Sequence, residues 1–554
     1  MIRRPFRLLF AAAALGVLAL SAPVTHADEH QAPAKDQGEA KSPPQSGRVI
    51  GLFRTSAADP GSDDGKATDG KSAEARPSAA PQGGNLLALL PPDSVTSHTL
   101  ATPSGPLAYA ATAGTLDLYG QGGEKIAAVF YTAYVAKDGG RDRPLTFVFN
   151  GGPGAASAYL HLGLVGPKIL DFGPTGHDGA AARLVDNPQS WLAFTDLVII
   201  DPVGTGWSRA AKPDDAKTFY GVNADAETMA KVIALYVAHN DRGNSPKYLL
   251  GESYGGFRAA KTAARLREQQ GIMVSGIVML SPLIDGAVSI GSGGSGNSSL
   301  HAALELPSMA AAELERKGAF TPQALAEAEH FALTDYLTAL TGPPPPEPAA
   351  RELYARVAAL TGLAPEAVTR SRGFVRRDYI KQVRERDHKV VSAYDAALAM
   401  PDPYPEMLDE HGGDPVLAGF TRAYGGAFAA YARAELGFKC DMTYTLLAHL
   451  SWQWGSRDQG SMSEASASDE LRETLALSPS FRLLIAHGTS DLVTPYAANK
   501  YVIDHLPASL TEGRVALKLY RGGHMLYTNP ASRLAFTADA RAFYAGEGTT
   551  TGRN

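Results

Sequence analysis

Six short, continuous apolar runs constrain the fold of this chain more than any other feature of its sequence. Each run is rich in Val, Ile, Leu or Phe, and helical or long connecting segments separate it from the next. The runs are "LTFVF" (145–149), "DLVII" (196–200), "YLL" (248–250), "GIVML" (276–280), "FRLLIA" (481–486) and "VALKLY" (515–520). Continuous runs, unlike alternating ones, are typical of central parallel strands that helices cover on both faces. The pattern therefore predicts an α/β fold with an open, mostly parallel sheet.

Other segments extend this sheet or interrupt it. Residues 115–140 alternate on both sides of a Gly-rich turn, which predicts an antiparallel hairpin. Apolar periodicity predicts helices over 225–240 and 257–270. Between Asp285 and about Lys439 the pattern is helical without strands, which predicts a helical cap inserted between two core strands. Such a cap would control which substrates reach the site.

The first 95 residues differ in composition from the rest. Three arginines, a short apolar core and small residues up to Ala27 form the pattern of a secretory signal peptide; a permanent anchor helix is the alternative. The segment that follows is rich in Ala, Gly, Ser and Pro and has too little apolar surface to fold. The predicted organisation is a signal peptide (1–27), a disordered spacer (28–95), a first part of the core (96–285), the cap (286–439) and a second part of the core (440–546). The predicted location is the periplasm or the outside of the cell.

Composition excludes several classes of protein. The chain has 554 residues and a net charge of −6, which argues against a surface that binds nucleic acid. Outside the N-terminus no apolar run reaches the roughly 18 residues of a membrane span, so we expect none after signal cleavage. Cys440 is the only cysteine, so the chain has no internal disulfide. We find no metal-ligand spacing, phosphate loop or dinucleotide fingerprint, and expect no cofactor.

One serine is surrounded by glycines between a predicted strand and a predicted helix. Gly251-Glu252-Ser253-Tyr254-Gly255 fits the G-x-S-x-G nucleophile elbow, in which a sharp turn exposes the hydroxyl above the sheet. The glycines prevent clashes in that turn, and the helix N-terminus favours negative charge. A plain strand-to-helix turn is the alternative reading. We predict that Ser253 is a nucleophile.

A serine nucleophile needs a base and a carboxylate that orients the base, in the chain order Ser, Asp, His for this architecture. Asp491 and His524 follow the last two predicted strands, at the strand ends where open α/β sheets assemble their sites. Asp201 precedes the serine, and Asp285 has no histidine-bearing strand directly after it. His487 lies within the end of its strand, where a structural role is the better interpretation. We therefore predict the triad Ser253, Asp491 and His524.

Five segments in this order resemble the serine carboxypeptidase family, which has the α/β-hydrolase fold. They are "FVFNGGPGAASAYLHLGLVGP" (147–167), "NPQSWLAFTDLVIIDPVGTGWSR" (187–209), "GESYGGFRAA" (251–260), "HGTSDLVTPYAANKYV" (487–502) and "GGHMLYTNP" (522–530). The resemblance covers the core and only weakly the cap. It implies that Ser253 attacks the peptide carbonyl, that His524 is base and then acid, and that Asp491 fixes the imidazole. It also implies an oxyanion hole formed by the backbone N–H groups of Gly152 and Tyr254.

The resemblance further implies that Asn150, Gly151 and Glu252 grip the C-terminal carboxylate of a peptide. In the family a second glutamate shares hydrogen bonds with the one in the elbow, and here its position is Leu164. A Glu that faces a carboxylate must hold a proton, so Glu252 needs another partner. His161 is one candidate donor; a packed or exposed histidine is the other interpretation.

The leading functional prediction is an exported serine-type carboxypeptidase that acts on peptides. A second reading keeps the triad in an esterase, an acyltransferase or another peptidase, because a fold does not determine a substrate. A third is a non-catalytic binding protein of the cell envelope.

Overall fold

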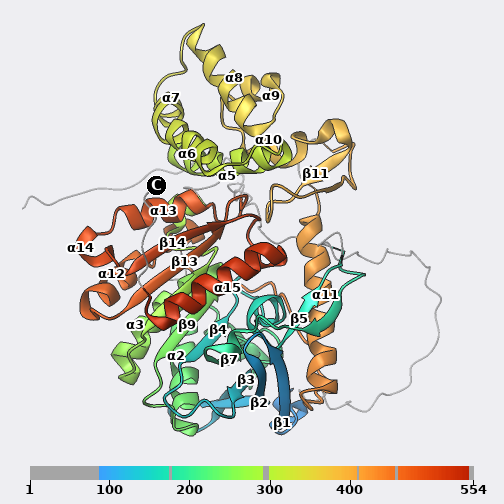
Figure 1. Cartoon of the computed structure of the whole chain (residues 1–554), viewed down its shortest axis with the longest axis vertical. Helices are drawn as coiled ribbons and strands as arrows, with labels where there is room; N and C mark the ends of the chain where they lie inside the picture. Colours follow the sequence, from blue (N-terminus) through green and yellow to red (C-terminus); the bar gives the residue numbers. More distant parts are fainter. Residues whose placement is uncertain (1–85, 174–177, 291–297, 408–410, 456–459, 548–554) are drawn as a thin grey trace, which may run out of the picture. The chain divides into compact units, whose positions relative to one another are not determined.

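A computed structural model describes residues 86–173, 178–290, 298–407, 411–455 and 460–547. Within them, ten strands form one large sheet (Figure 1). These strands are β1 (Ser94–Thr102), β2 (Gly105–Tyr119), β3 (Lys125–Ala136), β4 (Leu145–Phe149), β7 (Asp196–Ile200), β8 (Arg209–Ala210), β9 (Lys247–Glu252), β10 (Gly276–Leu280), β13 (Arg482–Gly488) and β14 (Val515–Tyr520). The predicted signal peptide and most of the predicted spacer lie outside the described residues.

The strand order is β1-β2-β3-β7-β4-β9-β10-β13-β14, with β8 paired to β3. From β7 to β14 every neighbouring pair is parallel, whereas β1, β2 and β3 are antiparallel to their neighbours. This is the α/β-hydrolase topology, and it confirms the predicted fold class. The six apolar runs are six strands of the sheet, and the predicted hairpin is β2 and β3.

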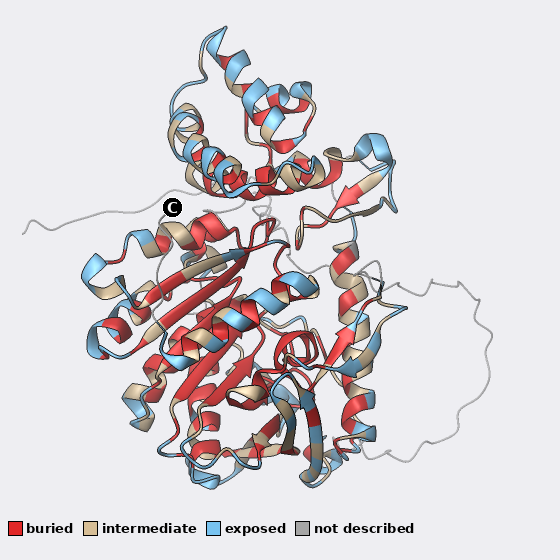
Figure 2. Ribbon diagram, in the orientation of Figure 1, coloured by how far each residue is buried: buried red, intermediate tan, exposed pale blue. Residues whose placement is uncertain are grey.

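Helices cover both faces of the sheet, so successive strand residues enter two different cores. Phe147, Val198 and Leu249 pack in one buried cluster with α2 (Val222–His239), α3 (Tyr254–Gln270) and α12 (Ser468–Leu477). Their chain neighbours Val148 and Leu250 pack in the opposite cluster with α11 (Pro415–Ala434) and α15 (Pro530–Ala545). Figure 2 shows the strands buried between these helices. Burial on both faces explains why the strands are apolar without alternation.

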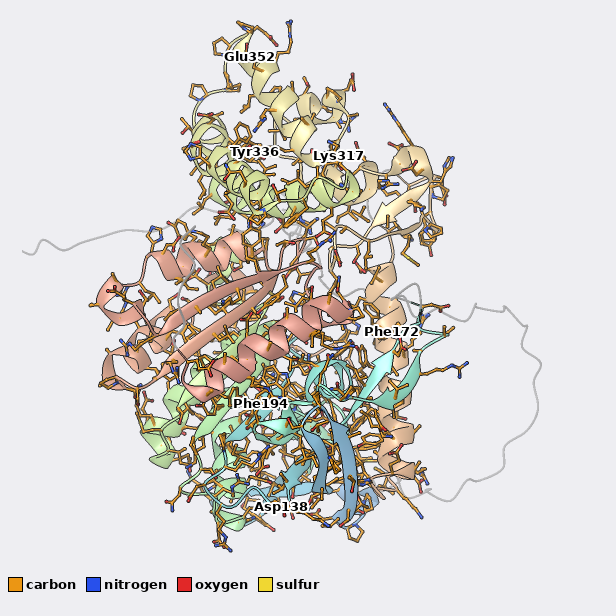
Figure 3. The ribbon with its side chains drawn as sticks, viewed as in Figure 1. Asp138, Phe172, Phe194, Lys317, Tyr336 and Glu352 are labelled. Atoms are coloured by element: carbon orange, nitrogen blue, oxygen red, sulfur yellow. The ribbon has the colours of Figure 1, made fainter. Side chains whose placement is uncertain are left out.

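The long segment between β10 and β13 is mainly helical. Its helices before α11 are α4 (Gly286–Ser289), α5 (Ser299–Arg316), α6 (Pro322–Phe331), α7 (Leu337–Thr341), α8 (Ala349–Thr361), α9 (Pro365–Arg370) and α10 (Arg376–Gln382). Several of them share a hydrophobic cluster of their own, in which Tyr336, labelled in Figure 3, is fully buried. Contrary to the strand-free expectation, β11 (Lys389–Val391) and β12 (Ala399–Pro401) form a hairpin here. Three-residue strands are too short to leave a periodic signal in the sequence.

The remaining elements connect or flank this core. They are α1 (Ala158–Leu160), β5 (Lys168–Asp171), β6 (Arg183–Asp186), α13 (Tyr496–Asp504) and α14 (Ala508–Thr511). None of the helices in the described part of the chain is long and apolar enough to cross a membrane.

Candidate active site

Ser253 occupies a strained turn between β9 and α3. Its φ of 61° and ψ of −127° are unusual for a residue with a side chain, and such geometry costs on the order of 1–3 kcal/mol. A Cβ on Gly251 would collide with the carbonyl oxygen of Gly255, and a Cβ on Gly255 would collide with that of Phe149. Only glycine fits at both positions, as the elbow motif requires. The Ser253 residue is partly exposed, whereas Glu252 and Tyr254 on either side are buried.

Asp491 and His524 lie in hydrogen-bond contact beyond the ends of β13 and β14. The Nδ1 atom of His524 is 2.9 Å from Oδ2 of Asp491, and both side chains are almost wholly buried. The N–H groups of Val493 and Thr494 donate to Oδ1 of Asp491, and the Thr494 hydroxyl lies 2.9 Å from both Oδ2 and the Ser281 carbonyl oxygen. The imidazole and two backbone N–H groups therefore orient one carboxylate.

Electrostatics suit His524 to act as a base. Burial lowers the pKa of His524, but the charge of Asp491 and its hydrogen bond outweigh burial, so the pKa is raised. Because a carboxylate accepts at Nδ1, the proton of the neutral ring lies on Nδ1 and Nε2 is left with its lone pair. Such an imidazole can remove a proton from a hydroxyl and return it to a leaving group.

The loop after β4 lies against the elbow. A Cβ on Gly151 would collide with the backbone of Glu252, Tyr254 and Gly255, so the two segments are in direct backbone contact. Gly152, the next residue, has a φ of +99°, which favours glycine. The Tyr254 N–H is among the first of α3, and the first N–H groups of a helix lack partners within the helix.

Glu252 is held by two side chains from other parts of the chain. The Asn150 amide donates to Oε2 of Glu252 at 2.5 Å, and the Tyr527 hydroxyl lies 3.0 Å and 3.2 Å from its two oxygens. Burial raises the pKa of Glu252 to about 7, although the charge of His524 and these two hydrogen bonds oppose the rise. A buried carboxyl that is neutral in mild acid therefore stands next to the candidate nucleophile. The Tyr527 bond also joins the loop of His524 to the residue before Ser253.

The donor to Glu252 is Tyr527 and not His161, and the interpretation of His161 as a packed histidine is confirmed. The Nε2 atom of His161 is 2.7 Å from the Tyr134 hydroxyl, and burial lowers the pKa of His161 to about 3. Leu164 is buried in the core. A Cβ on Gly163 would collide with the Tyr527 ring, so this glycine leaves room for the tyrosine. Tyr527 stands three residues after His524, but no sequence signal shows that it reaches Glu252.

The residues that we did not choose for the triad make contacts that stabilise the fold. Asp201 accepts from the Ser157 N–H at 2.8 Å, and Asp285 caps the start of α4. His487 is buried, with Nε2 2.7 Å from the Asn499 amide and Nδ1 3.9 Å from the Asp491 carboxylate. Among the described residues, no group of three or more His, Cys, Asp or Glu side chains could hold a metal ion.

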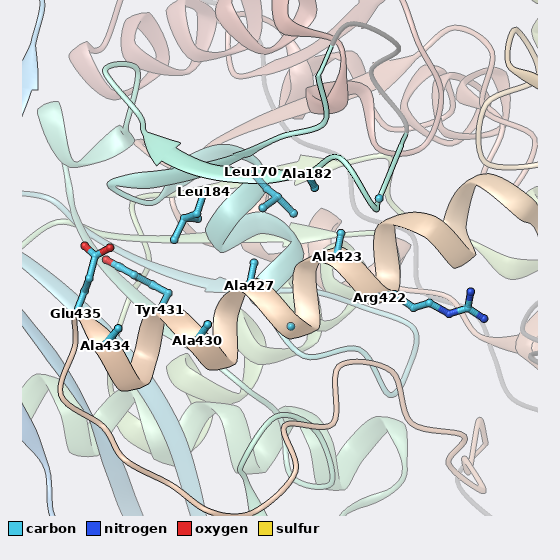
Figure 4. Close-up of a pocket in the computed structure, with 12 residues that line it drawn as sticks. Leu170, Ala182, Leu184, Arg422, Ala423, Ala427, Ala430, Tyr431, Ala434 and Glu435 are labelled. Atoms are coloured by element: carbon cyan, nitrogen blue, oxygen red, sulfur yellow. The ribbon is translucent and has the colours of Figure 1, made fainter.

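A separate hollow lies between α11 and the hairpin of β5 and β6 (Figure 4). Its volume is about 500 Å³, and small residues of α11 line much of it. None of the candidate site residues is among those that line it.

Part of the chain is similar to known proteins. A family model described as serine carboxypeptidase matches residues 106–303. This part of the chain is similar to the serine carboxypeptidase family. The match contains the candidate nucleophile and the loop after β4, and it ends before the strands that precede Asp491 and His524.

Serine carboxypeptidase-like 44 of Arabidopsis thaliana is 28% identical over 182 residues, which cover 32% of this chain and 35% of that protein. The pheromone-processing carboxypeptidase KEX1 of Yarrowia lipolytica is 27% identical over 149 residues, which cover 26% of this chain and 23% of that protein. The chain thus spans about a third or less of the length of these family members. The solved structure of a KEX1 prohormone-processing carboxypeptidase from Saccharomyces cerevisiae aligns with a TM-score of 0.47 and 15% identity, over 79% of this chain and 92% of that one.

Proposed function

We propose that this protein is a serine-type carboxypeptidase that hydrolyses the last peptide bond of its substrates. The observation that carries the proposal is Glu252, a buried carboxyl with a raised pKa directly before Ser253. A carboxyl that stays neutral beside the nucleophile suits an enzyme that binds a substrate carboxylate, because two buried like charges repel each other.

In the proposed reaction, Nε2 of His524 removes the proton from Ser253, whose oxygen attacks the carbonyl carbon of the last peptide bond. Asp491 keeps the imidazole in the required tautomer and stabilises the imidazolium. The backbone N–H groups of Gly152 and Tyr254 would stabilise the oxyanion; removal of one such donor typically costs about 3–4 kcal/mol. His524 then protonates the leaving amine, and a water activated by the same imidazole hydrolyses the acyl-enzyme.

Exopeptidase specificity would come from three groups beside the nucleophile. The Gly151 N–H and the Asn150 amide are donors to the substrate carboxylate, and protonated Glu252 adds an O–H donor. Since the pKa of Glu252 is about 7, this O–H is present in acid and is lost as the pH rises above neutrality. The Tyr527 hydroxyl keeps Glu252 oriented when the family's second glutamate is replaced by Leu164.

The test is to digest a peptide and its C-terminal amide with the purified protein at pH 5.5 and to analyse the products by mass spectrometry. We expect stepwise removal of single residues from the free acid and much slower cleavage of the amide. The Ser253→Ala variant should leave both peptides intact. Equal turnover of the two peptides would reject carboxypeptidase action and favour a general acyl hydrolase.

We further propose that the protein is exported and acts on peptides in the periplasm or outside the cell. The support is the signal-like pattern of residues 1–27, which lie outside the described residues. N-terminal sequencing of protein recovered from the periplasm and medium tests this; a mature N-terminus near Asp28 is expected, and retention of Met1 would contradict it.

A further inference from the structure

The loop between β11 and β12 contacts both loops that carry the acid and the base of the candidate triad. We call residues 392–396 of this loop the strap. The His524 N–H donates to the Tyr394 carbonyl at 2.6 Å. The Ala396 N–H donates to the Ser490 carbonyl at 2.9 Å, and the Leu492 N–H donates to the Ala393 carbonyl at 3.1 Å. The residues on both sides of Asp491, and His524 itself, are therefore hydrogen-bonded to one short segment of the insertion.

A single carboxylate of the strap joins the two loops. Oδ1 of Asp395 accepts from the Ser490 hydroxyl at 2.6 Å, and the Gly523 backbone packs against Asp395 so closely that a Cβ on Gly523 would lie 2.7 Å from the Asp395 Cβ. Ser490 directly precedes Asp491, and Gly523 directly precedes His524. A Cβ on Gly523 would collide with the Tyr394 carbonyl, so the approach needs glycine. Burial raises the pKa of Asp395 to about 6, although the hydrogen bond from the Ser490 hydroxyl opposes the rise.

The strap also contacts the imidazole. The Tyr394 ring lies edge-on to the His524 ring, with centroids 5.3 Å apart and an interplanar angle of 88°. Tyr394 is buried. Together with the bond from Asp491 to Nδ1, this contact restricts rotation of the imidazole.

The strap is itself held by helices of the insertion. The Ser392 hydroxyl and the Ala393 N–H donate to the Asp414 carboxylate, which also caps the start of α11. Arg316 at the end of α5 donates to the Ala396 carbonyl at 2.9 Å. Leu492, the neighbour of Asp491, is buried in the hydrophobic cluster of the insertion's own helices.

We propose that the strap positions the triad: Asp395, through Ser490 and Gly523, sets the separation and orientation of Asp491 and His524. The insertion would then act on the chemical step, and not only on the access of substrates as its sequence suggests. The kinetic part of this inference rests on the proposed function. The structural part, namely that the strap keeps the two triad loops in fixed positions, does not rest on the proposed function.

The test compares Asp395→Asn with a matched control, Asp402→Asn. Asp402 lies in the same insertion, where its carboxylate pairs with Lys381 at 2.6 Å and accepts from the Tyr404 N–H at 2.9 Å. Hydrogen–deuterium exchange and turnover of a free-acid peptide are measured for both variants and the wild type. In Asp395→Asn we expect faster exchange of the peptides around Leu492 and His524, and a fall in kcat on the order of tenfold to hundredfold with KM nearly unchanged. Asp402→Asn should match the wild type in both loops and in kcat.

Unchanged exchange and kcat in Asp395→Asn would overturn the proposal. A rise in KM alone would also overturn it, because that result would mean that the strap controls substrate binding and not the chemical step. If Asp395→Asn does not fold, Ser490→Ala can be used instead, because it removes the Ser490 contact of Asp395 and leaves the Gly523 contact. This variant should also show faster exchange and a lower kcat with KM nearly unchanged, but the changes should be smaller. A wild type without turnover would refute the proposed function, and the exchange comparison would still decide the role of the strap.

Discussion

Replacement of Tyr527 by Phe should move the activity of this protein toward higher pH. The Tyr527 hydroxyl donates to Glu252 at 3.0 Å and 3.2 Å, and both residues are buried. Donation stabilises the charged carboxylate, so this bond holds the pKa of Glu252 below the value that burial alone would produce. Without the hydroxyl, Glu252 keeps its proton to a higher pH.

The size of the shift follows from the strength of the lost bond. A hydrogen bond to a charged group contributes about 1.5–3 kcal/mol, and one pKa unit corresponds to about 1.4 kcal/mol. The pKa of Glu252 should therefore rise from about 7 by roughly one to two units. Protonated Glu252 is the form that binds the substrate carboxylate. The alkaline limb of the kcat/KM profile should therefore move to higher pH by the same number of units.

The assay is kcat/KM for one blocked peptide with a free carboxylate, measured from pH 5 to pH 9. Tyr520→Phe is the matched control, because it removes another tyrosine hydroxyl that donates to a carboxylate, that of Asp539 at 2.7 Å. The control should keep the wild-type profile, and Glu252→Gln should lack the alkaline limb. An alkaline limb that stays in place or moves to lower pH in Tyr527→Phe would refute the reasoning.

Two further predictions concern stability and the chemical step. Glu252 has a pKa of about 7 in the fold against 4.5 when unperturbed, so the folded state binds more protons between these values and its stability falls as pH rises through this window. At pH 8 Glu252→Gln should therefore be more stable than the wild type by roughly 3 kcal/mol, and at pH 4 nearly equal to it, by urea unfolding; equal stability at both pH values would contradict this. Asp491→Asn should lower kcat on the order of 10³- to 10⁴-fold with a small change in KM, because His524 loses the carboxylate at Nδ1. A kcat within tenfold of the wild type would remove Asp491 from the proposed triad.

Much of the fold could be predicted because burial on two faces leaves a direct trace in the sequence. Four of the apolar runs coincide with β4, β7, β10 and β14, since each residue of a central strand packs against helices on one face or the other. The hairpin of β11 and β12 left no such trace. Its position depends on contacts of the strap with loops about a hundred residues later in the chain.

In the candidate site, too, only the features that leave a local sequence pattern could be predicted. The turn at Ser253 could be predicted because it requires glycines at fixed positions, and the proximity of Asp491 and His524 because both follow neighbouring strands; their catalytic roles stay predictions. Tyr527 and Asp395 could not be predicted, because their contacts join segments that no local pattern relates. For His161 the sequence left two interpretations open: its helical spacing was consistent with a contact to Glu252, but the fold packs it against Tyr134.

The account depends most on the pairing of Ser253 with the imidazole of His524. The direct measurement is the intact mass and peptide map of the protein after incubation with a fluorophosphonate, for the wild type and for His524→Ala. One adduct per chain, on Ser253, that forms at least a hundredfold more slowly in His524→Ala is the predicted result. Absence of an adduct from folded wild-type protein, or an adduct that forms equally fast without the imidazole, would contradict it.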